Sequence, residues 1–278
     1  VPHGSISPAE HMIGFYSSAL VKDGGTLQVG IGSLGSALVY STLLRHQHND
    51  VYRQLCHQLE LDKKFPVAAK TGGTGLFSKG LYGCSEMMVD GFIYLYRAGI
   101  LTREVFDSYE LQTLLNEEKI SNEVTLDTLD VLIAAGIVSR KLRARDVNYL
   151  KKIGVFTQKV EYKGGSLLVK GRPIDNQLDD DFVREELAAH CLGSRLAGGI
   201  VVHGGFFLGP RTFYRMLHEL TDQEHQKICM TSVNFINDLF DHRFGRQDLK
   251  VAQRRDARFI NSTMMATLSG AAISDGLA

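Results

Sequence analysis

The chain has 278 residues, of which 44% are hydrophobic, and its acidic and basic residues balance to a formal net charge of +0. This length is enough for one large domain or two ordinary ones with a substantial core. The neutral balance creates no overall field that would favour nucleic acid or an anionic membrane as a partner. No apolar run in the sequence approaches the roughly 18 residues that span a bilayer, so no membrane partner is expected.

The cysteine and histidine patterns indicate neither disulfides nor a metal centre. Four cysteines are widely spaced and form no C-x-x-C motif: Cys56, Cys84, Cys191 and Cys229. In a chain of this size such spacing indicates reduced thiols in a cytoplasmic protein. His46 and His48 are interpreted as polar side chains at a helix end, because a metal site needs further ligands. The first residues carry no secretory signal pattern.

The first hundred residues read as alternating helices and strands. Ser7-Pro8-Ala9-Glu10 is a capping box with proline at the first helical position, and it predicts a helix to about Val21. Alternation of apolar residues with polar residues or glycine predicts a strand over 27–32, and a helix follows from about Ser33 to Arg45. A further helix is expected around 50–61. The segment SEMMVDGFIYLYRAG, residues 85–99, is read as a helix that Ser85 caps and Gly99 ends.

Residues 111–195 are densely charged and read as an inserted subdomain. VTLDTLDVLIAAG and ARDVNYLKKIG predict two helices, and VFTQKVEYKGGSLLVKG predicts a hairpin that turns at Gly164-Gly165. This combination resembles a winged helix, and basic residues dominate from Arg140 to Arg172. The acidic stretch DNQLDDDFVREE follows directly and can neutralise them. The insert is therefore interpreted as structural, with no nucleic-acid partner.

The last eighty residues return to the pattern of the first hundred. GGIVVHGGFFLG predicts a strand with a glycine turn, GPRTFYRMLHEL a helix, KICMTSVNFIND a strand ending in polar residues, and ARFINSTMMATLSGAAI one or two more strands. Repetition of strand, glycine turn and helix predicts an α/β fold, with a mostly parallel sheet and flanking helices. The expected domains are residues 1–110 together with 196–278, and the helix-helix-hairpin insert 111–195.

A glycine motif at the end of the first strand raises the question of a nucleotide cofactor. Gly30-x-Gly32-x-x-Gly35 has the spacing of a dinucleotide-binding loop. Such a fold also needs an acidic residue at the end of a second strand about 20 residues on, but that distance falls in the polar, helical segment RHQHNDVYRQLCHQLEL. Two interpretations remain open besides a nucleotide-dependent oxidoreductase. The glycines and the helix N-terminus accommodate an anion or a developing oxyanion, or the glycines serve only strand–helix packing.

Two candidate nucleophiles lie in the segment Gly83-Cys84-Ser85-Glu86-Met87. It approaches the G-x-S-x-G elbow of serine hydrolases but lacks the last glycine. His203-Gly204-Gly205 resembles an esterase oxyanion tripeptide, which in those enzymes precedes the elbow in the chain rather than following it. Glu86 is predicted in the first turn of a helix, where the dipole favours an ionised carboxylate. It is either a covalent nucleophile or an ordinary helix-stabilising acid.

Several stretches, taken in order, resemble the acetyl-CoA hydrolase/CoA-transferase family, which includes 4-hydroxybutyrate and succinyl-CoA:acetate CoA-transferases. DGGTLQVGIGSLGSALV is similar to its strand–QxGxG–helix segment, and YGCSEMMVDGFIYLYRAGILT to its catalytic stretch. GGIVVHGGFFLGPRTFYRML, SVNFIND and ARFINSTMMATLSGAAISDGLA match later segments. Together the matches cover about 200 residues in the family's order.

The resemblance implies the chemistry and the site residues. Glu86 would be the nucleophile that forms a glutamyl-CoA thioester, in a CoA-transferase passing CoA to a short-chain carboxylate or in an acetyl-CoA hydrolase. Gln28, Gly30 and Gly32 match the motif that lines the site, and Asn237 matches a polar residue near the reacting acyl group. Coenzyme A would be a substrate, with no permanently bound cofactor and no metal. A homodimer is also implied.

The chain departs from the family pattern in three respects. The family's N-terminal α/β domain is missing, the chain ends before the expected CoA loop, and Met265 and Thr267 stand where many members carry acidic or amide residues. We therefore expect the C-terminal half of a longer bacterial member, which alone can fold without activity. The alternative is a CoA-ligand-binding or regulatory module whose site is vestigial.

Overall fold

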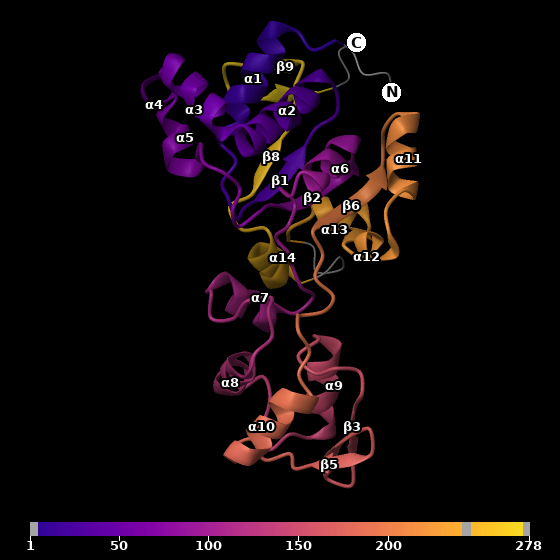
Figure 1. Ribbon diagram of the computed structural model, residues 1–278. Coiled ribbons are helices and arrows are strands. Elements are labelled where there is room, and N and C mark those ends of the chain that lie inside the picture. Colours follow the sequence, from indigo (N-terminus) through magenta and orange to yellow (C-terminus); the bar gives the residue numbers. More distant parts are fainter. Residues whose placement is uncertain (1–4, 241–245, 275–278) are drawn as a thin grey trace. The chain divides into compact units, whose positions relative to one another are not determined.

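The computed structural model describes residues 5–240 and 246–274, which divide into two compact units (Figure 1). Unit 1 consists of the described residues up to Val105 and from Ile200 onward, and unit 2 runs from Phe106 to Gly199. The inserted unit therefore begins at 106 and ends at 199, where the sequence placed its limits at 111 and 195.

Unit 1 combines a parallel sheet with flanking helices. Its strands are β1 (Thr26–Val29), β2 (Tyr82–Met88), β6 (Val202–Phe207), β7 (Ile228–Met230), β8 (Arg258–Ile260), β9 (Met265–Ala266) and β10 (Ala272–Ile273). Its helices are α1 (Pro8–Ser18), α2 (Ser33–Gln47), α3 (Asn49–Gln58), α4 (Leu61–Lys64), α5 (Pro66–Thr71), α6 (Asp90–Arg97), α11 (Arg211–His218), α12 (Asp222–His225), α13 (Val233–Asn237) and α14 (Gln247–Gln253). The predicted α/β class with a mostly parallel sheet is confirmed.

The central sheet has five parallel strands in the order β7-β6-β2-β1-β8. The chain steps from β1 to β2, β6 and β7 in one direction and then returns to place β8 on the free side of β1. Because crossovers between parallel strands are right-handed, the two directions of travel place their helices on opposite faces. Helices α2 and α6 therefore pack together on one face, whereas α13 packs against β2 and β6 on the other.

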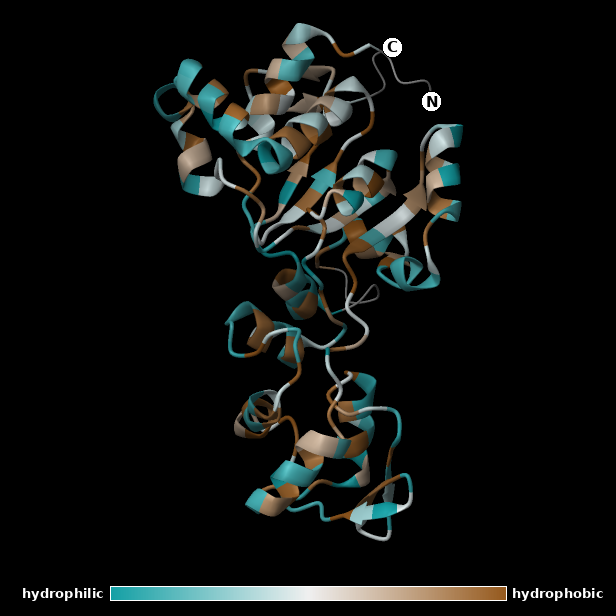
Figure 2. Cartoon of the chain, in the orientation of Figure 1, coloured by the Kyte–Doolittle hydropathy of each residue, from teal (hydrophilic) through white to brown (hydrophobic). Residues whose placement is uncertain are grey.

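The helices of the first face are amphipathic and supply the main core of unit 1. In α11, Phe213, Met216 and Leu217 are buried, whereas its arginines Arg211 and Arg215 are exposed. Figure 2 shows this as alternating brown and teal turns along α11. The three-and-four spacing of the buried residues is the spacing of one helix face, which explains why this sequence forms a helix lying on a sheet.

Helix α1 begins as the sequence predicts. The Ser7 hydroxyl accepts from the Glu10 backbone, and the Glu10 carboxylate accepts from the Ser7 backbone. The helix ends at Ser18, before the expected Val21. Its Glu10 carboxylate also accepts a hydrogen bond from the Ser33 hydroxyl at the start of α2, and these hydrogen bonds lower the pKa of Glu10.

A buried arginine connects α2 to the surrounding loops. Arg45 is 1% exposed, and its guanidinium donates to the backbone carbonyls of Gly75, Ser18 and Val21 at 2.7, 3.0 and 2.6 Å. The same group lies 4.2 Å from the ring centroid of Phe77. A buried charge needs such partners, so one side chain holds three separate chain segments together.

Arg45→Met should lower the free energy of unfolding by about 3 kcal/mol, because it leaves buried carbonyls without donors. Urea unfolding followed by circular dichroism measures the change. Arg53→Met, which removes an exposed arginine from the neighbouring α3, is the matched control and should change stability by less than about 0.5 kcal/mol. Equal effects from both substitutions would contradict a structural role for the buried guanidinium.

Unit 2 contains more elements than the expected two helices and hairpin. Its helices are α7 (Tyr109–Asn116), α8 (Leu126–Ala134), α9 (Ala144–Lys152) and α10 (Asp181–His190), and its strands are β3 (Val160–Lys163), β4 (Ser166–Val169) and β5 (Arg172–Ile174). The two predicted helices and the turn at Gly164-Gly165 are present, and β5 extends the hairpin to a three-stranded antiparallel sheet. Its own buried apolar cluster makes unit 2 compact by itself.

Basic and acidic stretches of unit 2 pair with each other, as their order along the chain suggests. Arg140 contacts Asp179 at 2.7 Å, and Arg172 contacts Glu186 at 2.6 Å.

Among the described residues, no helix combines the length and apolarity that crossing a membrane requires.

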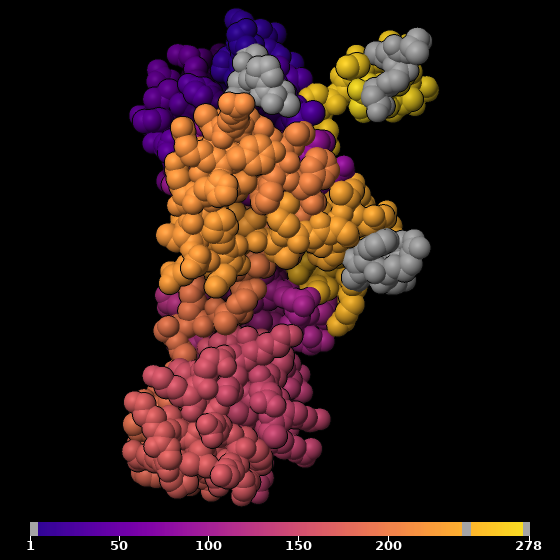
Figure 3. All heavy atoms as spheres, turned by 90° about the vertical axis from the view of Figure 1, so that its right-hand side faces the viewer, coloured from indigo at the N-terminus to yellow at the C-terminus, as the bar shows by residue number. Residues whose placement is uncertain are grey.

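The hairpin of β9 and β10 projects from the rest of unit 1, and its yellow atoms stand apart in Figure 3. Met265 and Thr267, at which the sequence departs from the family pattern, both lie in this hairpin and are exposed. Residues 275–278, which complete the stretch matched to the family, lie outside the described residues.

Candidate functional site

Glu86 lies in a strand and not in the first turn of a helix. Strand β2 runs through Tyr82–Met88, and α6 begins only at Asp90 after its N-cap, Val89. The Ser85 hydroxyl donates to the Met87 carbonyl instead of capping a helix. The predicted start of the helix at Ser85 is therefore wrong, and so is the assignment of Glu86 to a helix dipole, whereas the later part of the predicted helix is present as α6. Gly99, with φ of 73° after the C-cap Ala98, does end α6 as expected.

The physical reason for this error is the central place of β2 in the sheet. It pairs with β1 on one side and β6 on the other, and a strand covered on both faces lacks the alternation of apolar and polar residues that marks a half-buried strand. Without that alternation, the segment Tyr82–Met88 cannot be distinguished from a helix by periodicity alone. Glu86 consequently stands near the carboxyl end of a central parallel strand, which is where ligands bind in open α/β sheets.

Strand register places the predicted site residues on one face of the sheet. Leu27 is the partner of Gly83, and side chains alternate along each strand. Gln28 and Gly30 therefore face the same side as Cys84 and Glu86. This is the face that α13 covers, since Ile236 of α13 is buried in one cluster with Tyr82 and Cys84.

Asn237 makes the direct contact with Glu86. Its Nδ2 donates to Glu86 Oε2 at 2.7 Å, although the two residues are 151 positions apart in the sequence. Asn237 was expected at the end of a strand, but it is the last residue of α13, which Ser232 caps. Glu86 is partly buried and Asn237 is exposed, so the pair lies at the surface of unit 1 and can be reached from solvent.

Helix α14 fixes the end of α13 that carries Asn237. Lys250 Nζ donates to the Asp238 carbonyl at 2.6 Å, and Arg254 donates to the carbonyls of Ile236 and Phe235 at 2.9 and 2.5 Å. The last carbonyls of a helix have no N–H donors within it, and cations near them are favourable. Two cationic side chains thus restrain the turn of chain from which the Asn237 amide reaches Glu86.

Glycine at position 205 allows β6 to approach Glu86 closely. A Cβ atom there would lie 2.8 Å from the Glu86 carbonyl oxygen and 3.1 Å from Val233 Cγ2. Close packing therefore explains why glycine occupies position 205. An oxyanion tripeptide, which the sequence His203-Gly204-Gly205 resembles, is not required to explain this glycine.

His203 lies on the same face beneath α13. Its Nδ1 shares a hydrogen bond of 2.7 Å with Tyr82 Oη. Burial, and secondarily the positive charge of Arg254, lower the pKa of His203 to about 4. The folded protein thus holds a neutral imidazole at neutral pH.

Stability should fall as the solution is acidified from about pH 6.5 to pH 4. In this range an unfolded histidine binds a proton that folded His203 does not, so the free energy of unfolding rises with pH. The expected loss from this residue between pH 7 and pH 4.5 is about 2–3 kcal/mol. Urea unfolding of the native protein and of His203→Gln at both pH values measures it. The variant should lose correspondingly less, and an unchanged pH dependence would contradict the assignment.

The glycine turn after β1 has two separate roles. Gly32 is the N-cap of α2 with φ of 93°, a conformation that favours glycine. A Cβ at Gly35 would lie 2.0 Å from the Gly30 carbonyl oxygen, so Gly35 serves close strand–helix packing. The Gly30 amide donates to the Ile260 carbonyl at 2.9 Å, which excludes it as a free oxyanion donor in this conformation.

Gln28 contacts a residue that the sequence did not single out. Gln28 Nε2 donates to Asn261 Oδ1 at 3.1 Å, and a Cβ at Gly30 would lie 3.1 Å from the same oxygen. Asn261 directly follows β8, the strand that pairs with the other side of β1. A polar residue after a strand is the signal that could have found it, but sequence alone did not reveal that β8 adjoins β1.

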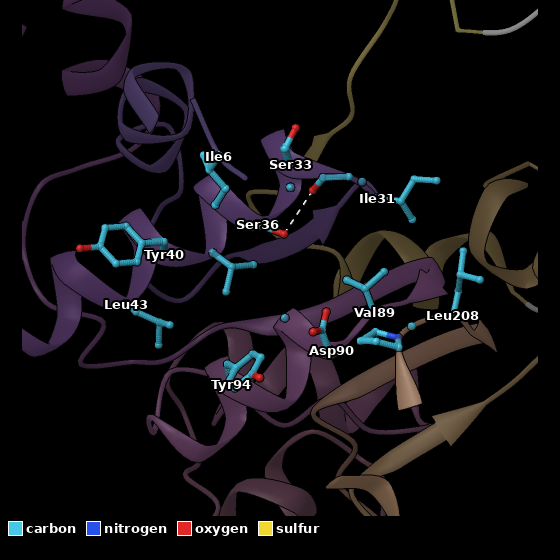
Figure 4. Close-up of a pocket in the computed structure, with 17 residues that line it drawn as sticks. Ile6, Ile31, Ser33, Ser36, Tyr40, Leu43, Val89, Asp90, Tyr94 and Leu208 are labelled. Carbon is cyan, nitrogen blue, oxygen red and sulfur yellow. Dashed lines mark hydrogen bonds between the residues drawn. The ribbon is translucent and has the colours of Figure 1, made fainter. Parts of the chain in front are cut away.

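A cavity of about 480 Å³ begins at the glycine turn and extends between α2 and α6 (Figure 4). Gly30 and Gly32 line it, whereas Gln28, Glu86 and Asn237 do not. The structure therefore brings Glu86 and Asn237 into contact, pairs Gln28 with Asn261, and places Gly30 on the Glu86 side of the sheet and at the edge of the cavity. Gly32 belongs to the cavity alone.

Neither a comparison with known proteins nor a cluster of metal-binding side chains identifies the site independently. Within the described residues, no group of three or more His, Cys, Asp or Glu side chains could hold a metal ion. No family model, no curated protein and no solved structure matches the chain. A functional assignment therefore depends on the sequence resemblance and on the geometry around Glu86.

Proposed function

We propose that the protein is an acyl-CoA:carboxylate CoA-transferase or an acetyl-CoA hydrolase that acts through a glutamyl-CoA thioester at Glu86. The observation that carries the proposal is the 2.7 Å hydrogen bond from Asn237 to Glu86 at the carboxyl edge of the sheet. Two residues that the family resemblance singles out separately are in contact, and Gln28 and Gly30 face the same side.

The reaction begins with the Glu86 carboxylate attacking the thioester carbonyl of an acyl-CoA. The carbon–sulfur bond breaks, giving a mixed anhydride between the acyl group and Glu86 and a free CoA thiolate. The thiolate then attacks the glutamyl carbonyl, which releases the acyl group as a carboxylate and leaves CoA bound to Glu86 as a thioester. Covalent catalysis of this kind divides one difficult transfer into easier steps.

The second half of the cycle decides between transfer and hydrolysis. A short-chain carboxylate can attack the glutamyl-CoA thioester, after which the CoA thiolate attacks the acyl side of the new anhydride and restores Glu86. Water can instead hydrolyse the thioester, which returns the Glu86 carboxylate and free CoA.

Asn237 and the turn after β1 supply the polar groups for these steps. The Asn237 amide holds one Glu86 oxygen and leaves the other for attack, and it can donate to the oxygen of the glutamyl carbonyl as charge develops there. The first backbone N–H groups of α2 have no acceptors within the helix and are donors available to an acyl oxygen at the Gly32 turn. Gln28, whose Nε2 donates to Asn261 Oδ1, adds a further polar side chain on the same face of the sheet.

The resemblance also proposes partners for this chain. They are acyl-CoA, a short-chain carboxylate, a second copy in a homodimer, and an N-terminal α/β domain of the same polypeptide. Coenzyme A enters and leaves as a substrate.

Steady-state kinetics of the full natural polypeptide that contains this chain test the proposal. We expect ping-pong kinetics with acetyl-CoA and propionate, and exchange of labelled acetate into acetyl-CoA in the absence of any other acceptor. A hydrolase would instead release CoA without an acceptor. Saturable binding of CoA with neither turnover nor exchange would contradict the proposal and support a regulatory module with a vestigial site.

A further inference from the structure

The cavity between α2 and α6 has the size and composition of a ligand pocket. About 480 Å³ lies within the range of roughly 300–1,000 Å³ for small-molecule sites. Its walls are mostly apolar and aromatic, and Figure 4 shows Ser36, Tyr40 and Leu43 of α2 facing Asp90 and Tyr94 of α6 across it. It lies at the carboxyl edge of the parallel sheet, where α/β folds bind ligands.

The mouth of the cavity exposes large apolar side chains. Ile31, Tyr40 and Tyr94 line it and are 48%, 55% and 44% exposed. An exposed apolar patch gathered around one concave site is typical of a binding surface. A ligand entering there would remove these side chains from water.

The described part of the cavity wall offers no cationic side chain to an anionic end of a ligand. Among the described residues that line it, Asp90 carries the only ionisable acid or base besides the two tyrosines, and no lysine, arginine or histidine is present. A second carboxylate, such as the free end of a dicarboxylic acyl group, would find no cationic partner there and would lie near the Asp90 carboxylate. An uncharged chain avoids both costs.

The cavity reaches the turn after β1, although it lies between α2 and α6 on the face of the sheet opposite Glu86. Gly30 lines the cavity, and strand alternation places Gly30 on the side of the sheet to which Glu86 belongs. A thioester held at the turn after β1 therefore has the Glu86 side chain on one side of the turn and the cavity on the other.

We propose that this cavity binds the hydrocarbon part of the acyl group, and that the protein acts on uncharged acyl-CoAs of medium length in preference to acetyl-CoA and to dicarboxylic acyl-CoAs. The inference rests on the proposed function at Glu86. A methyl group would occupy only a small part of about 480 Å³, whereas each further methylene removed from water improves binding by about threefold to fourfold.

A chain-length series on the full natural polypeptide tests the inference. The kcat/KM value should rise by about tenfold from acetyl-CoA to butyryl-CoA and again to hexanoyl-CoA, and butyryl-CoA should exceed succinyl-CoA by at least about tenfold. A flat or falling series, or a preference for succinyl-CoA, would overturn the inference while leaving catalysis at Glu86 intact.

A cavity-filling variant locates the effect. Ser36 lines the cavity, and Ser36→Leu should reduce kcat/KM for hexanoyl-CoA by about tenfold with less than about a twofold change for acetyl-CoA. Gln47→Leu, at an exposed position of the same helix, should change neither. An equal loss with both substrates in a folded Ser36→Leu protein would place the acyl chain elsewhere.

Binding measurements separate this inference from the proposed function. Calorimetry with acetyl-CoA, hexanoyl-CoA and succinyl-CoA needs no turnover, and hexanoyl-CoA should bind most tightly to the Glu86→Gln protein. If no acyl-CoA reacts but this order of affinities holds, the catalytic proposal fails and the cavity assignment stands. Equal affinities would overturn the cavity assignment whatever the activity.

Discussion

Glu86→Gln is expected to abolish CoA transfer and acyl-CoA hydrolysis, with a fall in kcat on the order of 10⁴ or more. The substitution removes the nucleophilic carboxylate but keeps the shape of the side chain. It also keeps an oxygen that can accept the hydrogen bond from Asn237, which is 2.7 Å long in the native protein. The loss should therefore appear in kcat with little change in the free energy of unfolding. Acetyl-CoA and hexanoyl-CoA turnover in the full natural polypeptide, together with urea unfolding, measure both quantities.

Glu219→Gln is the matched control for this substitution. Glu219 follows α11, its side chain is 51% exposed, and it pairs with Arg97 at the surface. An exposed pair contributes little to stability, so this variant should retain full activity. Residual activity of Glu86→Gln within tenfold of the native protein would exclude Glu86 as the nucleophile.

Gly35→Ala is expected to cost about 3 kcal/mol of unfolding free energy, one of the largest structural effects of a single methyl group in this chain. The added Cβ would lie 2.0 Å from the Gly30 carbonyl oxygen and 3.3 Å from Val29 Cγ1. Backbone cannot yield as a flexible side chain can, so overpacking should shift α2 away from the end of β1. Urea unfolding followed by circular dichroism gives the loss directly.

Gly75→Ala is the control for the glycine substitution. Nothing lies within 4 Å of a Cβ built at Gly75, and its backbone is not in the left-handed region. Alanine there should be neutral or slightly stabilising. If Gly35→Ala were equally neutral, close packing of α2 against the end of β1 would not explain why glycine occupies position 35.

The sequence predicted the architecture of unit 1 because its signals are local and repeated. The Ser7–Glu10 capping box, the glycine turn after β1 and the amphipathic spacing in α11 each follow from residues within one or two turns of each other. Repetition of strand and helix then implies parallel strands. The order of the strands in the sheet, with β8 beside β1, depends on residues far apart and could not be predicted in this way.

The errors occurred where tertiary contacts override local periodicity. The segment Tyr82–Met88, which contains Glu86, forms a central strand because β1 and β6 both pair with it. Asn237 ends a helix although its segment reads as a strand. In unit 2, α7, α10 and β5 were not predicted.

The predicted site residues were found by resemblance more than by physical pattern. The contact between Asn237 and Glu86 has no local signal, and neither do the Lys250 and Arg254 contacts that restrain α13. Local sequence did identify the glycine turn, but its three glycines have different roles. Gly35 serves packing, Gly32 supplies a positive φ, and Gly30 lies beside Asn261.

Mass spectrometry of the Glu86 peptide tests the central claim most directly. The full natural polypeptide is incubated with acetyl-CoA, quenched with acid and digested. We predict that CoA is attached through a thioester to Glu86, that acetate discharges it, and that Glu86→Gln carries none. Absence of CoA from this peptide during turnover, or its attachment to another residue, would contradict the account.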